Sequence, residues 1–98
     1  MSTWEDVKAI GLELPGAEEG TSWGTPALKI GKKFWLRLRP EVDDPGLVVR
    51  VDPMERDFQM QAEPDTFFVT PHYDGYPAVL VRLASIDREN LRELLTEP

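Results

Sequence analysis

Apolar side chains recur at every second position in two segments of the chain, residues 34–39 and 47–51. Successive side chains of a β-strand point to opposite faces of a sheet, so this spacing is typical of a strand with one buried face. Residues 26–30, 67–70 and 78–83 form further short apolar runs. Because several of these runs follow one another after short turns, they predict a mainly antiparallel sheet of about five strands.

Segments near both ends of the chain show the spacing of amphipathic helices. Residues 4–14 carry apolar side chains at steps of three and four. Ser2 and Glu5 have the spacing of a capping box, and Thr3 is the neighbouring candidate cap. The residues after Asp87 again show an apolar helical stripe. We therefore expect a first and a last helix that each bury one apolar face.

A middle helix is indicated from Asp52 onward. The carboxylate of Asp52 can accept hydrogen bonds from first-turn amides, and Pro53 suits the first helical position. Met54, Phe58 and Ala62 recur at four-residue steps, and we expect them to form the buried stripe of this helix. The predicted order is α-βββ-α-ββ-α, an α+β fold with its helices packed on one face of the sheet.

Length and charge limit the possible classes of protein. The 98 residues correspond to one domain, so we expect residues 1–98 to fold as a unit. The chain lacks cysteine, which excludes disulfides and thiolate chemistry. Its net charge of −7 provides no overall attraction to nucleic acid or to anionic lipid. With no apolar run long enough for a membrane span and no signal segment at its start, the chain is expected to be cytoplasmic, without membrane contact.

The register of the first hairpin decides which side chains face outward. A three-residue loop of residues 31–33 pairs Ile30 with Phe34 and Leu28 with Leu36, which keeps the apolar side chains on one face. A two-residue turn would instead bring them onto the face of the basic residues, so we expect the longer loop. Phe34, Leu36 and Leu38 then lie beneath the helices. The outward side chains are predicted to be Lys29, Trp35, Arg37, Arg39 and Arg50.

Positive charge is concentrated on this hairpin. Residues 24–40 contain five basic residues and no acidic one, although the chain as a whole is acidic. Lys and Arg around an exposed Trp are suited to phosphate contact combined with base stacking. Alternatively, their aliphatic stems cover the outer sheet face and their charges pair with acidic residues of the helices. We call the candidate nucleic-acid surface the basic strip; its members are Lys29, Lys32, Lys33, Trp35, Arg37, Arg39 and Arg50.

A second candidate site is the loop around His72, the only histidine. Tyr73 and Tyr76 follow it closely, and Trp23 lies in a Gly- and Pro-containing bend elsewhere in the chain. A small-ligand or protein-interaction site could use His72 as a proton donor or acceptor. Alternatively, the aromatic rings pack against the protein and hold the loop in place.

Catalytic and metal-binding motifs are missing from the sequence. It contains no phosphate-binding glycine motif, no nucleophile elbow and no paired-histidine zinc motif. A single histidine without cysteine offers no ligand set of defined spacing. We therefore expect a non-enzymatic protein that carries no metal and no cofactor.

Three motifs occur together along the chain: L-P-G-A-E-E at residues 14–19, W-G-T-P-A-L-K at 23–29 and V-T-P-H-Y at 69–73. In this combination the chain resembles the MmcQ/YjbR family of small bacterial proteins. The resemblance implies a CyaY-like (frataxin-like) α+β fold with a double-wing arrangement. It also implies binding to DNA, which in this acidic chain would require a local basic surface.

Overall fold

The computed structural model describes residues 2–22, 24–40, 45–73 and 75–96. The helices of this described part are α1 (Trp4–Gly11), α2 (Pro53–Ala62) and α3 (Arg88–Thr96). Its strands are β1 (Ala17–Ser22), β2 (Thr25–Ile30), β3 (Lys33–Arg39), β4 (Gly46–Arg50), β5 (Phe67–Phe68) and β6 (Ala78–Arg82). The short 3₁₀ helices η1 (Pro71–Tyr73) and η2 (Leu83–Ser85) precede and follow β6.

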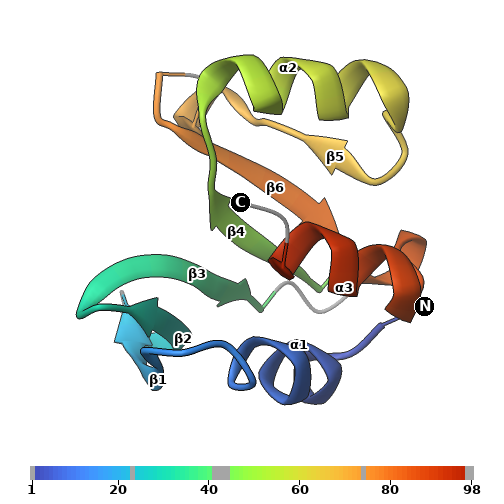
Figure 1. Cartoon of the computed structure of the whole chain (residues 1–98). Coiled ribbons are helices and arrows are strands. Elements are labelled where there is room, and N and C mark those ends of the chain that lie inside the picture. The colour runs from blue at the N-terminus through green and yellow to red at the C-terminus, as the bar shows by residue number, and fades with distance from the viewer. Residues whose placement is uncertain (1, 23, 41–44, 74, 97–98) are drawn as a thin grey trace.

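The strands form one sheet in the order β1-β2-β3-β4-β6-β5, and each neighbouring pair is antiparallel. α1 and α3 lie side by side, and α2 lies beyond them near β5 and β6 (Figure 1). Val7 of α1, Met60 of α2 and Leu91 of α3 all contact the same apolar cluster on one face of the sheet. The predicted α+β class, with helices on one face of an antiparallel sheet, is confirmed.

β1 is an additional strand at the sheet edge, which the sequence analysis did not predict. Its segment, A-E-E-G-T-S, has no alternation of apolar and polar side chains, and its side chains are exposed or half-buried. It is held by backbone pairing with β2, from Ala17 opposite Ile30 to Ser22 opposite Thr25. Backbone pairing leaves no trace in the side-chain pattern of an edge strand, so hydrophobic periodicity could not predict it.

The N-terminal cap of α1 lies one residue later than the Ser2–Glu5 box predicts. Thr3 is the cap: its hydroxyl accepts from the amide of Asp6, whose carboxylate accepts from the amide of Thr3. Ser2 is buried, and its hydroxyl donates to the carbonyl of Ile86 over 2.8 Å. The bond to Ile86 connects two segments far apart in sequence, so local spacing alone could not assign Ser2.

The predicted cap of α2 is confirmed, and α3 has a cap of the same kind. Asp52 accepts from the amide of Met54 at 2.9 Å, and Pro53 occupies the first turn of α2. Asp87 accepts from the amide of Asn90 at 2.7 Å at the start of α3. These contacts span two or three residues and are therefore encoded locally.

The apolar stripe predicted for α2 is not buried. Met54 is 82% and Phe58 68% exposed, Ala62 is also exposed, and no residue of α2 is buried. The helix contacts the core through half-buried Met60 instead. The prediction failed because helical spacing identifies an apolar face, whereas the neighbouring elements determine whether that face is covered.

The hairpin turn differs from the predicted three-residue loop. Gly31 and Lys32 form a two-residue turn with φ values of +57° and +67°, the left-handed conformation that tight hairpins favour. Ile30 is therefore opposite Lys33, and the predicted pairing of Ile30 with Phe34 is wrong. Further along, the predicted pairing of Leu28 with Leu36 is confirmed.

A β-bulge at Trp35 makes these two registers compatible. Phe34 is opposite Lys29 and Leu36 is opposite Leu28, so Trp35 is the one extra residue on β3. A bulge places two consecutive side chains toward the same face. Trp35 and Leu36 accordingly both contact the apolar cluster beneath the helices.

The bulge reverses two predicted orientations. Trp35 does not belong to the outward surface, because it packs beneath the helices, next to Gly11 of α1. Phe34 does not lie beneath the helices, because it shares the opposite face with Lys29. The sequence pattern could not show this. Alternation with a period of two shows only which residues share a face, and one inserted residue exchanges the two faces for every residue beyond it.

Each face of the sheet carries an apolar cluster. The larger cluster lies beneath the helices and includes the fully buried Leu36, Leu47 and Val79. The smaller one lies on the opposite face, which we call the outer face. It consists of Val48, Ala78 and Leu80, with Phe68 and Tyr73 packed against it.

Candidate functional site: a basic and aromatic pocket on the outer face

Strand alternation places a set of cations on the outer face. Arg37 is opposite Val48 in the sheet, and Val48 is opposite Leu80, so these three side chains form one row across this face. The next row contains Arg39, Gly46 and Arg82. With Lys29 and Arg50, the outer face carries five basic side chains: Lys29, Arg37, Arg39, Arg50 and Arg82.

The loop after β5 folds back over this face. Tyr73, in η1, packs against the outer cluster, and its hydroxyl accepts a hydrogen bond from Nη2 of Arg37. The His72 ring lies edge-on to Tyr73, with ring centroids 4.9 Å apart, and 6.2 Å from the ring of Tyr76. Nη1 of Arg56 donates to the carbonyl of Tyr76 at 3.0 Å. The loop rings are thereby held beside the cations of β3 and β4.

A pocket of about 720 Å³ lies between this loop and the sheet. This volume is within the range of small-molecule sites, roughly 300–1,000 Å³. Its wall combines two guanidinium groups, aromatic rings and the hydroxyls of one serine and two tyrosines, with no carboxylate among the described lining residues. The lining residues are Ser22, Phe34, Arg37, Val48, Arg50, His72, Tyr73, Tyr76, Pro77 and Ala78.

A second aromatic contact lies beside the pocket. The guanidinium carbons of Arg82 and Arg39 lie 4.1 and 5.6 Å from the centroid of the Phe68 ring. Gly46 lies between Arg39 and Arg82 in the sheet, and it has no side chain that would separate the two guanidinium groups. The two guanidinium groups are therefore held on the Phe68 ring by cation–π contact.

Charge pairing differs between the two sides of the sheet. On the helix side, Arg88 lies 2.8 Å from a carboxylate oxygen of Asp6, and Arg92 lies 3.3 Å from one of Glu13. On the outer face the described strands contribute one carboxylate, Glu18, in the register position opposite Lys29. Within the described residues no ion pair to a carboxylate is formed by Lys29, Arg37, Arg39 or Arg50. The alternative prediction, in which these side chains pair with helix acids, is not met in this part of the chain.

The members of the basic strip occupy different places. Lys29, Arg37, Arg39 and Arg50 lie on the outer face as predicted. Lys32 lies in the turn, and the neighbouring Lys33 is exposed at the hairpin tip. Trp35 lies on the opposite face of the sheet.

The His72 loop and two members of the basic strip, Arg37 and Arg50, line one pocket. The sequence predicts them as alternative sites, one for nucleic acid and one for a small ligand or a protein, and Arg37 and Tyr73 lie 36 residues apart. In the structure Tyr73 and Tyr76 line the same pocket as Arg37 and Arg50. Trp23, the remaining residue of the loop hypothesis, lies outside the described residues.

Three outer-face residues were missed by sequence reasoning. The sequence predicts Phe34 on the opposite face of the sheet, and it predicts no site role for Phe68. Arg82 follows Ala78 and Leu80 at two-residue steps, a signal that could have placed it on this face.

Other classes of site find no support in the described part of the chain. No helix there is long and apolar enough to cross a bilayer. No group of three His, Cys, Asp or Glu side chains among these residues is arranged to hold a metal ion. The fold and its surface thus define a small α+β domain whose outer sheet face is basic and lined by aromatic rings.

The sequence profile of the YjbR family matches residues 12–97. The chain therefore belongs to the YjbR family, as its resemblance to MmcQ/YjbR proteins predicted. It is 39% identical to uncharacterized proteins of Mycobacterium bovis and Mycobacterium tuberculosis over 110 residues, covering 99% of this chain and 85% of theirs. The crystal structure of a Deinococcus radiodurans protein with a DUF419 domain is also similar, with a TM-score of 0.77 and 26% identity, covering 97% of this chain and 74% of that one.

Proposed function

We propose that this domain binds DNA in single-stranded form through the outer face. The observation that carries the proposal is the set of basic side chains around an aromatic pocket, on a face where the described strands contribute one carboxylate. Phosphate contacts by Arg and Lys supply most of non-specific nucleic-acid affinity. A local cluster of this kind offsets the net charge of −7, because screening limits the repulsion from acids further away than about 8 Å.

The aromatic side chains favour a single strand over a duplex. Phe34, His72, Tyr73 and Tyr76 line the pocket, and an unpaired base can stack on such rings. In a duplex both faces of each base are covered by neighbouring bases, so only phosphate contacts would remain. The pocket volume of about 720 Å³ is sufficient for a nucleobase with its sugar.

We propose binding rather than catalysis as the role of this pocket. Its described lining has one histidine, His72, with no carboxylate beside it to form an acid–base pair. The cytoplasm, which the sequence predicts as the location, is compatible with contact to nucleic acid.

Fluorescence anisotropy with a labelled oligothymidine of about 12 nucleotides tests the proposal. Affinity should lie near the non-specific range, Kd of about 10⁻⁴–10⁻⁶ M at physiological salt. The logarithm of the association constant should fall linearly with the logarithm of salt concentration, with a slope of about 0.7 for each phosphate contacted. A duplex of equal length should bind more weakly.

Charge reversal on the two sides of the sheet provides the control. Replacing Arg39 and Arg50 by Glu leaves the bond between Arg37 and Tyr73 in place and should abolish binding. The matched variant replaces Arg88 and Arg92, on the helix side, and should bind the oligonucleotide like the parent after correction for net charge. Equal affinity in both variants would contradict the proposal. Tight, salt-independent binding of a mononucleotide would indicate the small-ligand site instead.

A further inference from the structure

α2 has an apolar face that the described part of the chain leaves uncovered. The helix has ten residues, none of them buried, and Met54 and Phe58 are 82% and 68% exposed. Isolated helices shorter than about 12–15 residues are marginal in water and are stabilised by packing their apolar face. α2 is capped and contacts the core through Met60, but its Phe58 face borders an open groove.

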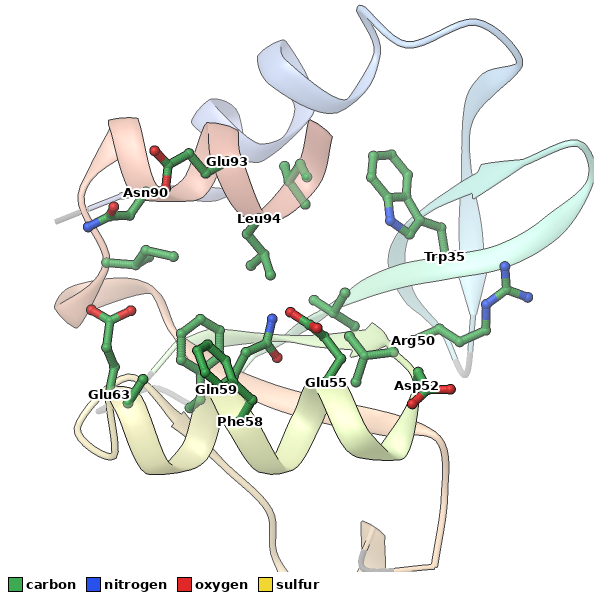
Figure 2. Close-up of a pocket in the computed structure, with 16 residues that line it drawn as sticks. Trp35, Arg50, Asp52, Glu55, Phe58, Gln59, Glu63, Asn90, Glu93 and Leu94 are labelled. Carbon is green, nitrogen blue, oxygen red and sulfur yellow. The ribbon is translucent and has the colours of Figure 1, made fainter. Parts of the chain in front are cut away.

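The groove lies between α2 and α3, on the helix side of the sheet, and has a volume of about 490 Å³ (Figure 2). Phe58 extends from α2 toward α3, and Leu94 extends from α3 toward α2 (Figure 2). Trp35 lines the end formed by the sheet. The apolar lining is completed by Val49, Val51, Ala62, Phe67, Ile86 and Leu95.

The groove is acidic, in contrast to the outer face. Four of its lining side chains are carboxylates and one, Arg50, is basic. The carboxylates belong to Asp52, Glu55, Glu63 and Glu93. Glu55 lies on α2, Asp52 and Glu63 cap the two ends of α2, and Glu93 lies on α3. Negative charge therefore flanks the apolar lining on two sides (Figure 2).

Gln59 adds an unsatisfied polar atom to this groove. Its Oε1 is buried and has no hydrogen-bond partner among the described residues, although Gln59 lines the groove. A buried acceptor without a donor is unfavourable, because it has lost its hydrogen bonds to water. A ligand that enters the groove with an N–H donor would remove this cost.

From these features we propose that the α2–α3 groove binds a basic amphipathic helix of a partner protein. Apolar side chains at i, i+3, i+4 and i+7 of that helix would contact Phe58 and Leu94. Its lysines and arginines would face Glu55 and Glu93, and one of its donors would reach Oε1 of Gln59. The groove is lined by side chains of two helices, which suits a helix better than an added strand.

A second copy of the chain fits this surface less well. In a two-fold dimer each surface meets itself, so the four carboxylates of one groove would lie against the same four carboxylates. Like charges brought together in an interface repel each other and oppose association. A nucleic acid is disfavoured for the same reason. The groove lies on the helix side of the sheet and the proposed DNA-binding pocket on the outer face, and Arg50 at the end of β4 lines both.

Binding can be measured with a designed peptide as the probe. The peptide is an amphipathic helix with leucines at i, i+3, i+4 and i+7 and lysines on the flanks of this face. Glutamate in place of every lysine gives the first control peptide, and a scrambled order gives the second. The domain carries Trp4→Phe and Trp23→Phe, so that Trp35 in the groove reports binding by fluorescence.

We expect the lysine peptide to shift Trp35 emission and to bind at least tenfold more tightly than either control peptide. Amide shifts in NMR spectra should concentrate on α2 and α3. Glu55→Lys with Glu93→Lys should weaken binding at least tenfold, and so should Phe58→Ala, whose side chain is mostly exposed and not required for the core. Glu89→Lys, an exposed change on α3 outside the groove, should have little effect.

Three results would overturn the proposal. The first is failure of the lysine peptide to bind the parent domain. The second is equal affinity for the glutamate peptide, which would show that charge does not select the partner. The third is a concentration-dependent dimer in sedimentation that Phe58→Lys dissociates, because a second copy would then be the occupant.

Discussion

The guanidinium of Arg37 donates a hydrogen bond to the hydroxyl of Tyr73, 36 residues later in the chain. This bond connects the sheet to the loop that covers it, and both residues line the outer-face pocket. The geometry of the pocket therefore depends on a contact between a strand residue and an aromatic residue of η1.

Tyr73→Phe tests how much this bond contributes to stability. A hydrogen bond to a charged group contributes about 1.5–3 kcal/mol when well shielded, and Arg37 and Tyr73 are only half-buried. We expect a loss of about 1 kcal/mol in the free energy of unfolding by urea. Tyr76→Phe is the matched control, because the Tyr76 hydroxyl forms no hydrogen bond within the described residues. Equal effects would show that the bond is not specific.

Side chains on the two faces of β3 should contribute differently to folding stability. Leu36 is fully buried, so Leu36→Ala should destabilise the domain by about 2–5 kcal/mol. Phe34 is half-buried on the outer face, so Phe34→Ala should cost only about 1 kcal/mol. Thermal and urea unfolding measure both values. A larger loss for Phe34 than for Leu36 would contradict the bulged register.

DNA binding should distinguish Phe34 from the adjacent Trp35. Phe34 lines the outer-face pocket, and its removal should weaken oligothymidine binding by about 1–3 kcal/mol if a base stacks on its ring. Trp35 lies beneath the helices, so Trp35→Phe should leave that affinity unchanged. Anisotropy titrations of both folded variants give the comparison. Loss of binding in the Trp35 variant alone would place the interface on the other side.

Gly46→Ala should disrupt the pairing of β4 with β6. A β-carbon at Gly46 would collide with the backbone carbonyl oxygen of Val81, and backbone atoms cannot move aside cheaply. We expect a loss of about 1–3 kcal/mol, as for other overpacked sites. Gly75→Ala is the control, because a β-carbon there meets no described atom within 4 Å. Unfolding of the two variants in urea should differ clearly.

The hairpin turn can be stabilised by changing Lys32. Its φ of +67° is unfavourable for a residue with a side chain, by about 1–2 kcal/mol. Lys32→Gly removes this strain but adds freedom to the unfolded chain, so a net gain of about 0.5 kcal/mol is expected. Lys33→Gly, in the strand, should instead be destabilising. A stability loss in both variants would show that the turn at Lys32 is unstrained.

Much of the fold could be predicted from sequence because its signals are local. Asp52 and Asp87 cap helices through bonds to residues two or three positions away. The alternation in β3 and β4 reports burial of one face by side chains within the same segment. Such signals require no knowledge of distant parts of the chain.

The faces of β3 were decided by tertiary structure. The pairing of Leu28 with Leu36 is compatible with a two-residue turn only because Trp35 forms a bulge. An inserted residue exchanges the two faces of the strand on one side of the bulge. The alternating pattern of the sequence does not show at which residue the bulge lies. The positions of Phe34 and Trp35 therefore followed from packing against α1 rather than from spacing.

The sequence by itself determined which groups this protein can use for binding: clustered arginines and lysines, and a loop with one histidine and two tyrosines. Tertiary structure decided that these groups form one pocket, because Arg37 and Tyr73 meet only when β3, β4 and β6 are paired. It also decided that Phe58 of α2 borders an open groove. The physical reason is the same in both cases: side-chain chemistry and local conformation are properties of short segments, whereas burial and proximity depend on segments far apart in the chain.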